Sequence, residues 1–321
     1  MKEHTIKEKV VVITGASSGV GRAMAVEFAG KGAKLILAAR REEALDEVVQ
    51  ECESMGAMAL TVPADVRYVD DMQALARAAH RFGGAIDVWV NNAGVLAAAE
   101  LNEAPAEVHD EVIRTNLMGY MHGAYAALPF FKEQGYGLLI NNISVGGWFP
   151  TPYAAAYTAS KFGIRGFSES LKGELSAYPH IHVCDLYPGF LDTPGIQHAA
   201  NYTGVFLKPA PPLYDPRRVA RAVVALTEHP QPVVTIGVAP VFLKLAYSLF
   251  PSITRIITAA IIRSYIKKAD AMEATSGNVL LPVEYGRGID GGWRNANTSK
   301  PKLAGVVLLA LAAGLLLFQR R

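Results

Sequence analysis

From Lys9 to Leu186 the chain alternates short apolar segments with amphipathic ones, and this alternation constrains the fold more than any other feature. Short runs rich in Val, Ile and Leu are typical of strands buried on both faces, and the amphipathic segments between them predict helices. This order predicts an α/β fold, a doubly wound parallel sheet of Rossmann type with helices on both faces. The expected strands are 9–14, 33–38, 57–62, 86–90, 137–143, 182–186 and 233–236, and the expected helices are 19–31, 42–55, 69–82, 105–134, 153–177 and 216–228.

A glycine-rich turn, Thr14–Gly21, directly follows the first expected strand and opens the first expected helix. Glycines allow a tight turn and a close approach of the backbone to a ligand, and the helix N-terminus offers N–H groups to a pyrophosphate. In this strand–turn–helix context the turn predicts a dinucleotide site. The residues expected to contact the dinucleotide here are Gly15, Ser17, Ser18, Gly19, Val20 and Gly21.

The end of the second expected strand indicates which dinucleotide binds. A carboxylate there would accept hydrogen bonds from the ribose of NAD, but the chain reads Ala38-Ala39-Arg40-Arg41. Because a guanidinium suits a 2′-phosphate, we predict NADP(H), with Arg40 as its principal phosphate ligand. Arg41 can instead be the solvated start of the next helix, and Arg22 is a further candidate for the same phosphate.

Tyr157 and Lys161 lie four residues apart in an expected helix, thirteen residues after Ser144. At this spacing the phenol and the ammonium lie on one helix face. A free tyrosine has a pKa of about 10, and a nearby cation lowers it. The pair therefore predicts a tunable acid/base, although the same spacing also occurs on ordinary amphipathic helices, where it serves packing.

Taken together, these residues resemble the short-chain dehydrogenase/reductase family from about Lys7 to Thr235. The motifs occur in that family's order: TGxxxGxG at 14–21, Asp65-Val66, NNAG at 91–94, Asn116, Ser144, YxxxK at Tyr157 and Lys161, and Pro188-Gly189 followed by Thr193.

The resemblance implies an oxidoreductase that interconverts a carbonyl and an alcohol by hydride transfer with NADP(H). Tyr157 would be the acid/base, Ser144 would polarise the substrate oxygen, Lys161 would lower the Tyr157 pKa and bind the nicotinamide ribose, and Asn116 would hold a water. The further cofactor contacts that it implies are Asp65, Val66, Asn92, Ala93, Gly94, Tyr157, Lys161, Pro188, Gly189 and Thr193. Two alternatives are a catalytically idle NADP(H)-binding scaffold or sensor at a membrane, and an epimerase or dehydratase that holds NAD tightly.

Two segments follow the expected catalytic domain, which we place at 1–236. Residues 193–215 are rich in proline and aromatic residues and predict a substrate lid within that domain. The apolar extension 237–292 contains basic residues on an apolar helical background between Val238 and Lys268. That background suits a membrane-surface element, a dimer interface or a cover over the substrate cleft equally well.

Residues 303–318 form an uninterrupted run of apolar residues and glycine after an expected polar linker, 293–302. As a helix this run would reach roughly 24 Å, somewhat short of a hydrocarbon core of about 30 Å. It predicts a membrane anchor, as a thin span or a partly inserted segment, with a buried core helix as the alternative. We therefore expect a membrane-associated protein whose catalytic domain lies on the cytoplasmic side.

Composition limits the partners. The formal net charge of +2 and the absence of a long basic block give no indication of nucleic-acid binding. Cys52 and Cys184 lack metal-ligand spacing and His180 and His182 lack a third ligand nearby, so we predict no metal site. The apolar tail, the lid and a wall formed by Trp148, Phe149, Pro150 and Tyr153 predict a hydrophobic carbonyl or alcohol as substrate, and we expect a homo-oligomer.

Overall fold

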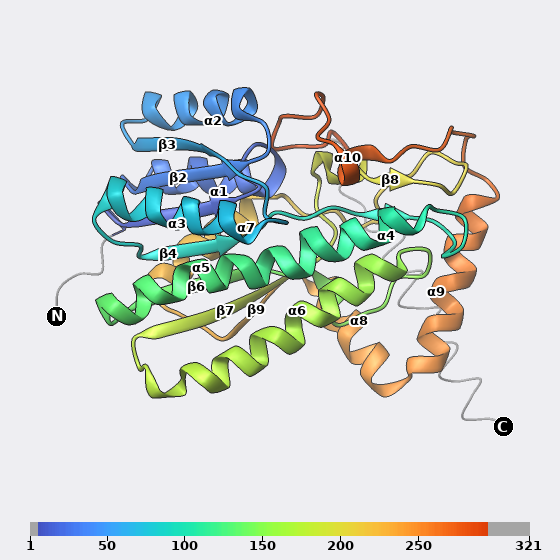
Figure 1. Ribbon diagram of the computed structural model, residues 1–321. Coiled ribbons are helices and arrows are strands. Elements are labelled where there is room, and N and C mark those ends of the chain that lie inside the picture. The colour runs from blue at the N-terminus through green and yellow to red at the C-terminus, as the bar shows by residue number, and fades with distance from the viewer. Residues whose placement is uncertain (1–5, 295–321) are drawn as a thin grey trace.

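The computed structural model describes residues 6–294, whose centre is a sheet of seven parallel strands in the order β3-β2-β1-β4-β6-β7-β9 (Figure 1). This arrangement confirms the predicted doubly wound parallel sheet. The strands are β1 Val10–Thr14, β2 Lys34–Ala39, β3 Met58–Pro63, β4 Val88–Asn91, β6 Gly137–Asn142, β7 Ile181–Pro188 and β9 Val233–Ile236.

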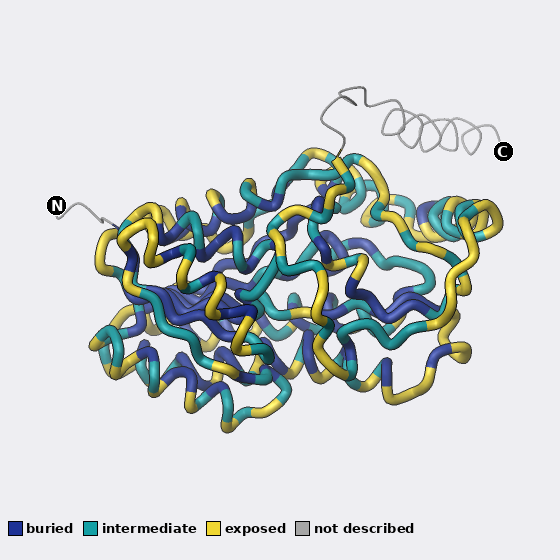
Figure 2. The backbone as a smooth tube through the Cα atoms, turned by 90° about the horizontal axis from the view of Figure 1, so that it is seen from above, coloured by how far each residue is buried: buried dark blue, intermediate teal, exposed yellow. Residues whose placement is uncertain are grey.

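Helices cover both faces of the sheet, and each layer buries its own apolar cluster. On one face, α1 (Gly19–Ala29), α2 (Glu42–Ser54) and α7 (Arg217–Glu228) bury Met24, Phe28, Leu45 and Val223. On the other face, α3 (Val69–Gly83), α5 (Gly119–Gln134) and α6 (Ala155–Glu174) bury Met72, Phe131 and Leu171. The strands are therefore buried from both sides, as Figure 2 shows, which is why their sequences are almost continuously apolar.

The long helix predicted at 105–134 is interrupted. It consists of α4 (Ala106–Ile113), a π-helical turn (Arg114–Met118) and α5. A single π-helical turn is short and is flanked by α-helix on both sides, so a helical pattern read over the whole segment gives little warning of it. Asn116 lies within this turn.

All strands end at the same edge of the sheet because their register is parallel throughout. Thr14 is level with Ala38, Asn91 with Asn141 and Pro188 with Ile236. Beyond this edge, two short strands that the sequence did not predict, β5 (Ala97–Ala98) and β8 (Ala200–Asn201), pair in parallel. They connect the loop after β4 to the predicted lid, and two-residue strands have no sequence periodicity that could reveal them.

The C-terminal extension folds back over the same edge. Helices α8 (Val238–Leu249) and α9 (Pro251–Ile266) form a helical hairpin. Residues 277–294, which begin with the short helix α10 (Gly277–Leu280), then cross to the dinucleotide side, and we call them the strap. Within residues 6–294 no helix is both long and apolar enough to cross a membrane, and the predicted tail 303–318 lies outside the described residues.

Candidate active site

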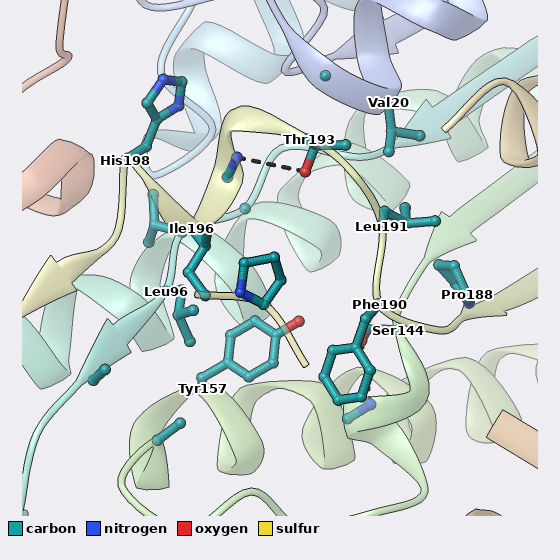
Figure 3. A pocket seen from close by; sticks show the side chains of 18 of the residues that line it. Val20, Leu96, Ser144, Tyr157, Pro188, Phe190, Leu191, Thr193, Ile196 and His198 are labelled. Atoms are coloured by element: carbon teal, nitrogen blue, oxygen red, sulfur yellow. Dashed lines mark hydrogen bonds between the residues drawn. The ribbon is translucent and has the colours of Figure 1, made fainter. Parts of the chain in front are cut away.

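A cavity of about 870 Å³ lies along the carboxyl edge of the sheet and brings the predicted site residues together (Figure 3). Every predicted cofactor contact lines it, as do three of the four predicted catalytic residues; the fourth, Asn116, does not. The predicted residues that line the cavity are Gly15, Ser17, Ser18, Gly19, Val20, Gly21, Arg40, Asp65, Val66, Asn92, Ala93, Gly94, Ser144, Tyr157, Lys161, Pro188, Gly189 and Thr193.

The glycine turn forms a cradle that a side chain would fill. Gly15 has a φ of +65°, and a Cβ added there would lie 2.8 Å from the Cα of Ala93. A Cβ on Gly21 would lie 2.1 Å from the Gly15 carbonyl oxygen, so neither position accommodates a larger residue. Because α1 begins at Gly19, its N-terminus faces this bare turn, and the two features together fit a dinucleotide pyrophosphate.

Side-chain hydrogen bonds join the ends of three neighbouring strands next to this cradle. The Thr14 hydroxyl donates to the Val90 carbonyl at 3.2 Å and accepts from the Asn92 N–H at 3.0 Å. The Asn92 amide donates to the Thr14 carbonyl at 2.9 Å, and the Asn142 amide donates to Asn92 Oδ1 at 2.9 Å. The NNAG motif therefore holds the strand ends of the site together.

Ser144 sits at the end of β6 with an unfavourable backbone. Its φ is +102°, a region that non-glycine residues rarely adopt, and such strain costs about 1–3 kcal/mol. The Ser144 N–H donates to the Leu186 carbonyl at 3.3 Å, and its hydroxyl accepts from the Gly146 N–H at 3.2 Å. These contacts direct the hydroxyl into the cavity, where it lies close enough to the Tyr157 phenol to influence its ionisation (Figure 3).

Burial controls the ionisation of Tyr157 in this structure. Burial raises the pKa of the phenol, and hydrogen bonding to Ser144 offsets part of that rise. The Lys161 ammonium lies 5.6 Å from the Tyr157 ring centroid, and its own burial lowers its pKa to about 7. The predicted lowering of the Tyr157 pKa by Lys161 is therefore not what these residues produce alone, because desolvation disfavours both charged forms.

Asn116 lies next to Lys161, but its side chain makes hydrogen bonds to other protein groups. A Cβ on Gly94 would meet Asn116 Oδ1 at 3.3 Å and Lys161 Nζ at 3.8 Å, which places the two side chains together. The Asn116 amide donates to the Val95 carbonyl at 2.9 Å and to Ser160 Oγ at 3.1 Å, and Oδ1 accepts from the Val95 N–H at 2.8 Å. Its side chain thus anchors the segment after β4, and its holding of a water stays a prediction.

The guanidiniums near the end of β2 have different environments. Arg40 lines the cavity and donates from Nη2 to the Asn278 carbonyl of the strap at 2.6 Å, and burial lowers its pKa. Arg41 also lines the cavity. Arg22, by contrast, pairs with Glu51 of α2 at 2.8 Å and donates to the Arg287 carbonyl at 3.0 Å. Arg22 does not line the cavity, because its guanidinium is bound by the α2 carboxylate and the strap, and its contact with the phosphate stays a prediction.

Asp65 is held by a neighbour rather than left free. Burial would raise the pKa of its carboxyl group, but hydrogen bonds from Arg67 outweigh burial and lower it. Arg67 Nη2 lies 2.6 Å from Asp65 Oδ2, and its Nη1 lies 2.6 Å from Glu111 Oε2. The pair fixes the loop after β3, where the resemblance implies that Asp65 and Val66 contact the cofactor.

The strap closes the dinucleotide side of the cavity and is the largest feature that sequence reasoning missed. The Gly19 N–H, in the first turn of α1, donates to the Gly288 carbonyl at 2.9 Å. The strap residues that line the cavity are Asn278, Pro282, Val283, Tyr285, Gly286 and Arg287. The strap accepts hydrogen bonds from Gly19, Arg22 and Arg40 through its main-chain carbonyls. Such contacts do not depend on side-chain identity, so no periodic sequence pattern reveals them.

One buried carboxylate fastens the strap. Asp192, 2% exposed, accepts hydrogen bonds from the Gly291 N–H at 3.1 Å, the Trp293 N–H at 2.8 Å and Arg294 Nε at 3.1 Å. Trp293 and Arg294 are the first two residues of the expected polar linker 293–302, and here they are bound to the catalytic domain. The rest of that linker lies outside the described residues.

The other half of the cavity is apolar. Phe149 and Tyr153 line it as predicted, and Leu96, Phe190 and Ile196 extend the same wall (Figure 3). Side chains of α8 and α9 complete this half, so the cavity supports the covering role among the three that the sequence left open for 238–268.

Trp148 and Pro150 do not line the cavity, so their place in the predicted wall is wrong. The Trp148 ring is instead bound by two cations, with the Arg165 guanidinium 3.5 Å and the Lys244 ammonium 3.6 Å from its ring centroid. It also packs on Tyr187 at a centroid distance of 5.0 Å. These cation–π contacts hold the indole outside the cavity.

Comparisons with known proteins agree with this geometry. Residues 9–202, more than half of the chain, match the family described as short chain dehydrogenase. An uncharacterized oxidoreductase of Bacillus subtilis, YxnA, is 32% identical over 98% of this chain and 91% of its own length. The 11-beta-hydroxysteroid dehydrogenase A of Sesamum indicum is 36% identical over 58% of this chain and 53% of its own length.

Two solved structures share the fold. The alcohol dehydrogenase of the archaeon Thermococcus sibiricus, complexed with 5-hydroxy-NADP, superposes with a TM-score of 0.62 at 28% identity, over 71% of this chain and 95% of that one. A metagenomic short-chain oxidoreductase in complex with NADP gives the same TM-score and identity over 72% and 97%. With its seven-stranded parallel sheet, glycine cradle and Ser–Tyr–Lys set, the chain belongs to the short-chain dehydrogenase/reductase family of oxidoreductases.

Proposed function

We propose that the chain is an NADP(H)-dependent oxidoreductase that interconverts a hydrophobic carbonyl compound and the corresponding alcohol. One observation carries this proposal: the Tyr157 phenol and the Ser144 hydroxyl meet within a cavity that has a dinucleotide cradle at one end and apolar walls at the other. Lys161 lies next to the phenol. A scaffold that only bound nucleotide would not need this combination.

Three observations support NADP(H) over NAD(H). The residues that follow the buried part of β2 are Ala39, Arg40 and Arg41, which include no carboxylate that could accept hydrogen bonds from a ribose 2′-hydroxyl. A guanidinium has five N–H donors, and the strap carbonyl uses one from Arg40, so others remain for a phosphate. The two structural relatives, from Thermococcus sibiricus and from a metagenome, carry an NADP derivative and NADP.

The bound nicotinamide would supply or accept the hydride, and the protein manages the proton. Tyr157 donates a proton to the substrate oxygen in the direction of reduction, and burial keeps the phenol protonated until that step because it raises the pKa. Ser144 donates a hydrogen bond to the same oxygen and stabilises the charge that develops there. Lys161, in its charged form, stabilises the phenolate that remains. Oxidation uses the same groups in reverse.

The substrate class follows from the apolar half of the cavity. Leu96, Phe149, Phe190 and Ile196 surround the approach to Tyr157, and side chains of α8 and α9 close the far side. Such walls favour a substrate with a large apolar body around one carbonyl or hydroxyl group.

The test is the oxidation of NADPH by the purified protein with a panel of hydrophobic ketones and aldehydes, compared with Tyr157→Phe. Loss of the proton donor should reduce turnover by about 10²- to 10⁴-fold while NADPH binding, measured by fluorescence, is retained. Tyr178→Phe is the matched control, because Tyr178 is exposed and does not line the cavity. Near-parental turnover by Tyr157→Phe would refute the mechanism, and NADPH binding without turnover of any substrate would favour the scaffold.

A further inference from the structure

The hairpin of α8 and α9 faces the cavity on one side only. Ala239 and Leu243 of α8 and Thr258, Ile262 and Ile266 of α9 line the cavity. In each helix only one residue, Pro240 in α8 and Thr254 in α9, is fully buried. The opposite side of the hairpin therefore remains without a partner among the described residues.

That opposite side is strongly apolar. Val241, Leu245 and Leu249 recur every four residues along α8, so they form one stripe, and they are 51%, 54% and 60% exposed. Ile256 on α9 is 67% exposed. Four large aliphatic side chains on a two-helix surface are more than the scattered apolar residues expected on a soluble surface, and such patches mark interaction sites.

All charges on the hairpin have one sign. Between Val238 and Ala269 the sequence has five basic residues and no Asp or Glu. Lys244 is bound to the Trp148 ring, whereas the others are exposed and take no part in the ion pairs found within residues 6–294. The exposed basic residues are Arg255, Arg263, Lys267 and Lys268. An apolar stripe next to unpaired cations is complementary to a surface of anionic lipid.

The cavity reaches the surface at this hairpin. Phe242 and Ile261, one from each helix, both line the cavity, yet each is 46% exposed. Both side chains line the cavity and are nearly half exposed, so a route between α8 and α9 into the apolar half of the site would pass between them.

We propose that the outer face of the α8–α9 hairpin docks on an anionic lipid bilayer, so that a hydrophobic substrate passes from the lipid between the two helices into the cavity. The substrate route rests on the proposed function, but the docking does not. A second copy of the chain fits this face less well, because the hairpin has no acidic residues and a symmetric contact between two hairpins would bring together charges of one sign only.

The first experiment uses the full chain with a single introduced cysteine that carries an environment-sensitive fluorophore. The native thiols, Cys52 and Cys184, are buried and should not react. Leu245→Cys reports on the hairpin, and Met58→Cys is the control because Met58 is equally exposed, at 54%, on the edge strand β3 at the opposite end of the molecule (Figure 1). The probes are vesicles of phosphatidylcholine alone or mixed equally with phosphatidylglycerol.

With the anionic vesicles the label at 245 should shift to the blue and be quenched by nitroxide-bearing lipid, while the label at 58 should not change. If the chain binds only through residues 303–318, both labels stay unchanged although the protein sediments with the vesicles, and the proposal is overturned. If the fluorescence at 245 changes with protein concentration in the absence of vesicles, the hairpin contacts a second copy of the chain, and the proposal is also overturned.

A second experiment tests the charges. Lys267→Glu/Lys268→Glu should lower the apparent affinity for anionic vesicles, measured by quenching of the label at 245, by at least about tenfold. Each basic residue near an anionic surface contributes to the binding free energy. Arg77→Glu/Arg81→Glu changes the net charge equally on α3 and should have no effect. Equal losses in the two variants would refute a specific docking face. Neither experiment measures turnover, so failure of the docking and failure of the proposed reaction are distinguishable.

Discussion

Asp192→Asn should release the strap while the rest of the fold stays intact. Asp192 Oδ1 accepts the Gly291 and Trp293 N–H groups at 3.1 and 2.8 Å, and Oδ2 accepts the main-chain N–H and Nε of Arg294, both at 3.1 Å. In asparagine an NH₂ group replaces one oxygen, so two donors of the strap meet a donor instead of an acceptor.

The magnitude follows from these contacts. Removing the charge from one member of a buried ion pair typically costs about 3–5 kcal/mol. The Arg294 side chain is 34% exposed and therefore partly screened by solvent. We take a lower value of about 2–3 kcal/mol for this variant, because screening reduces the contribution of partly exposed pairs. That value raises the equilibrium constant for strap opening by about thirty- to a hundred-and-fiftyfold.

The assay is amide hydrogen exchange read by mass spectrometry on the protein without added cofactor. Exchange in 285–294 should accelerate by that factor, and trypsin should cleave after Arg287 more readily, while the strands of the central sheet keep their parental protection. Asp290→Asn is the matched control, because Asp290 is 40% exposed and its pairs with Arg217 and Arg294 lie at the surface. Parental exchange rates in Asp192→Asn, or equal acceleration in Asp290→Asn, would refute the role of Asp192 as the fastener of the strap.

Three further predictions concern the site. Arg40→Ser should weaken NADPH binding by about ten- to a hundredfold and leave NADH binding nearly unchanged in fluorescence titrations, since a charge-assisted hydrogen bond contributes about 1.5–3 kcal/mol; equal weakening of both would contradict the phosphate assignment. Gly21→Ala should lower the free energy of unfolding by about 1–3 kcal/mol in denaturant titrations because its Cβ meets the Gly15 carbonyl, whereas Gly166→Ala, with nothing within 4 Å on α6, should raise it by about 0.5–1 kcal/mol. Burial lowers the pKa of Lys161 to about 7 in the folded protein, whereas its ordinary value is 10.5, so between pH 7 and pH 10.5 the unfolded chain binds one more proton than the folded chain. The free-energy cost of burying the charged ammonium is therefore full below pH 7 and disappears as the pH rises to 10.5. Lys161→Met should raise the melting temperature at pH 6 more than at pH 10, and a pH-independent difference would contradict this reasoning.

Local sequence patterns were sufficient for most of the sheet and for the dinucleotide half of the site. Strands such as β1 are buried on both faces and therefore consist almost entirely of apolar residues, with Thr14 at the end as the exception, which makes them easy to recognise. The glycine turn was recognisable because Gly15 has a positive φ and a Cβ on Gly21 would meet the Gly15 carbonyl, so both requirements arise within the turn itself.

Residues whose neighbours come from distant parts of the chain were harder to predict. Arg22 was expected at a phosphate but pairs with Glu51, and Trp148 was expected in the cavity but lies between Arg165 and Lys244. In both cases a long side chain had several possible partners, and only the packing of a second helix decided between them. The raised pKa of Tyr157 has the same origin, because desolvation depends on everything that surrounds a group and not only on the residue four positions away.

The sequence by itself determined the order of the site motifs along the chain: a glycine turn, an arginine pair, a serine and a Tyr–Lys pair. Each motif follows the carboxyl end of a strand or lies on the helix after it. Periodicity and steric exclusion act over short stretches, so these features can be recognised without a structure. Only the tertiary structure decided how the cavity is closed, with Asp192 holding the strap over the dinucleotide side and α8 and α9 lining the apolar side. The contacts of Asp192 join segments about a hundred residues apart through hydrogen bonds from main-chain N–H groups, and the helices close the cavity through shape, neither of which follows from local sequence.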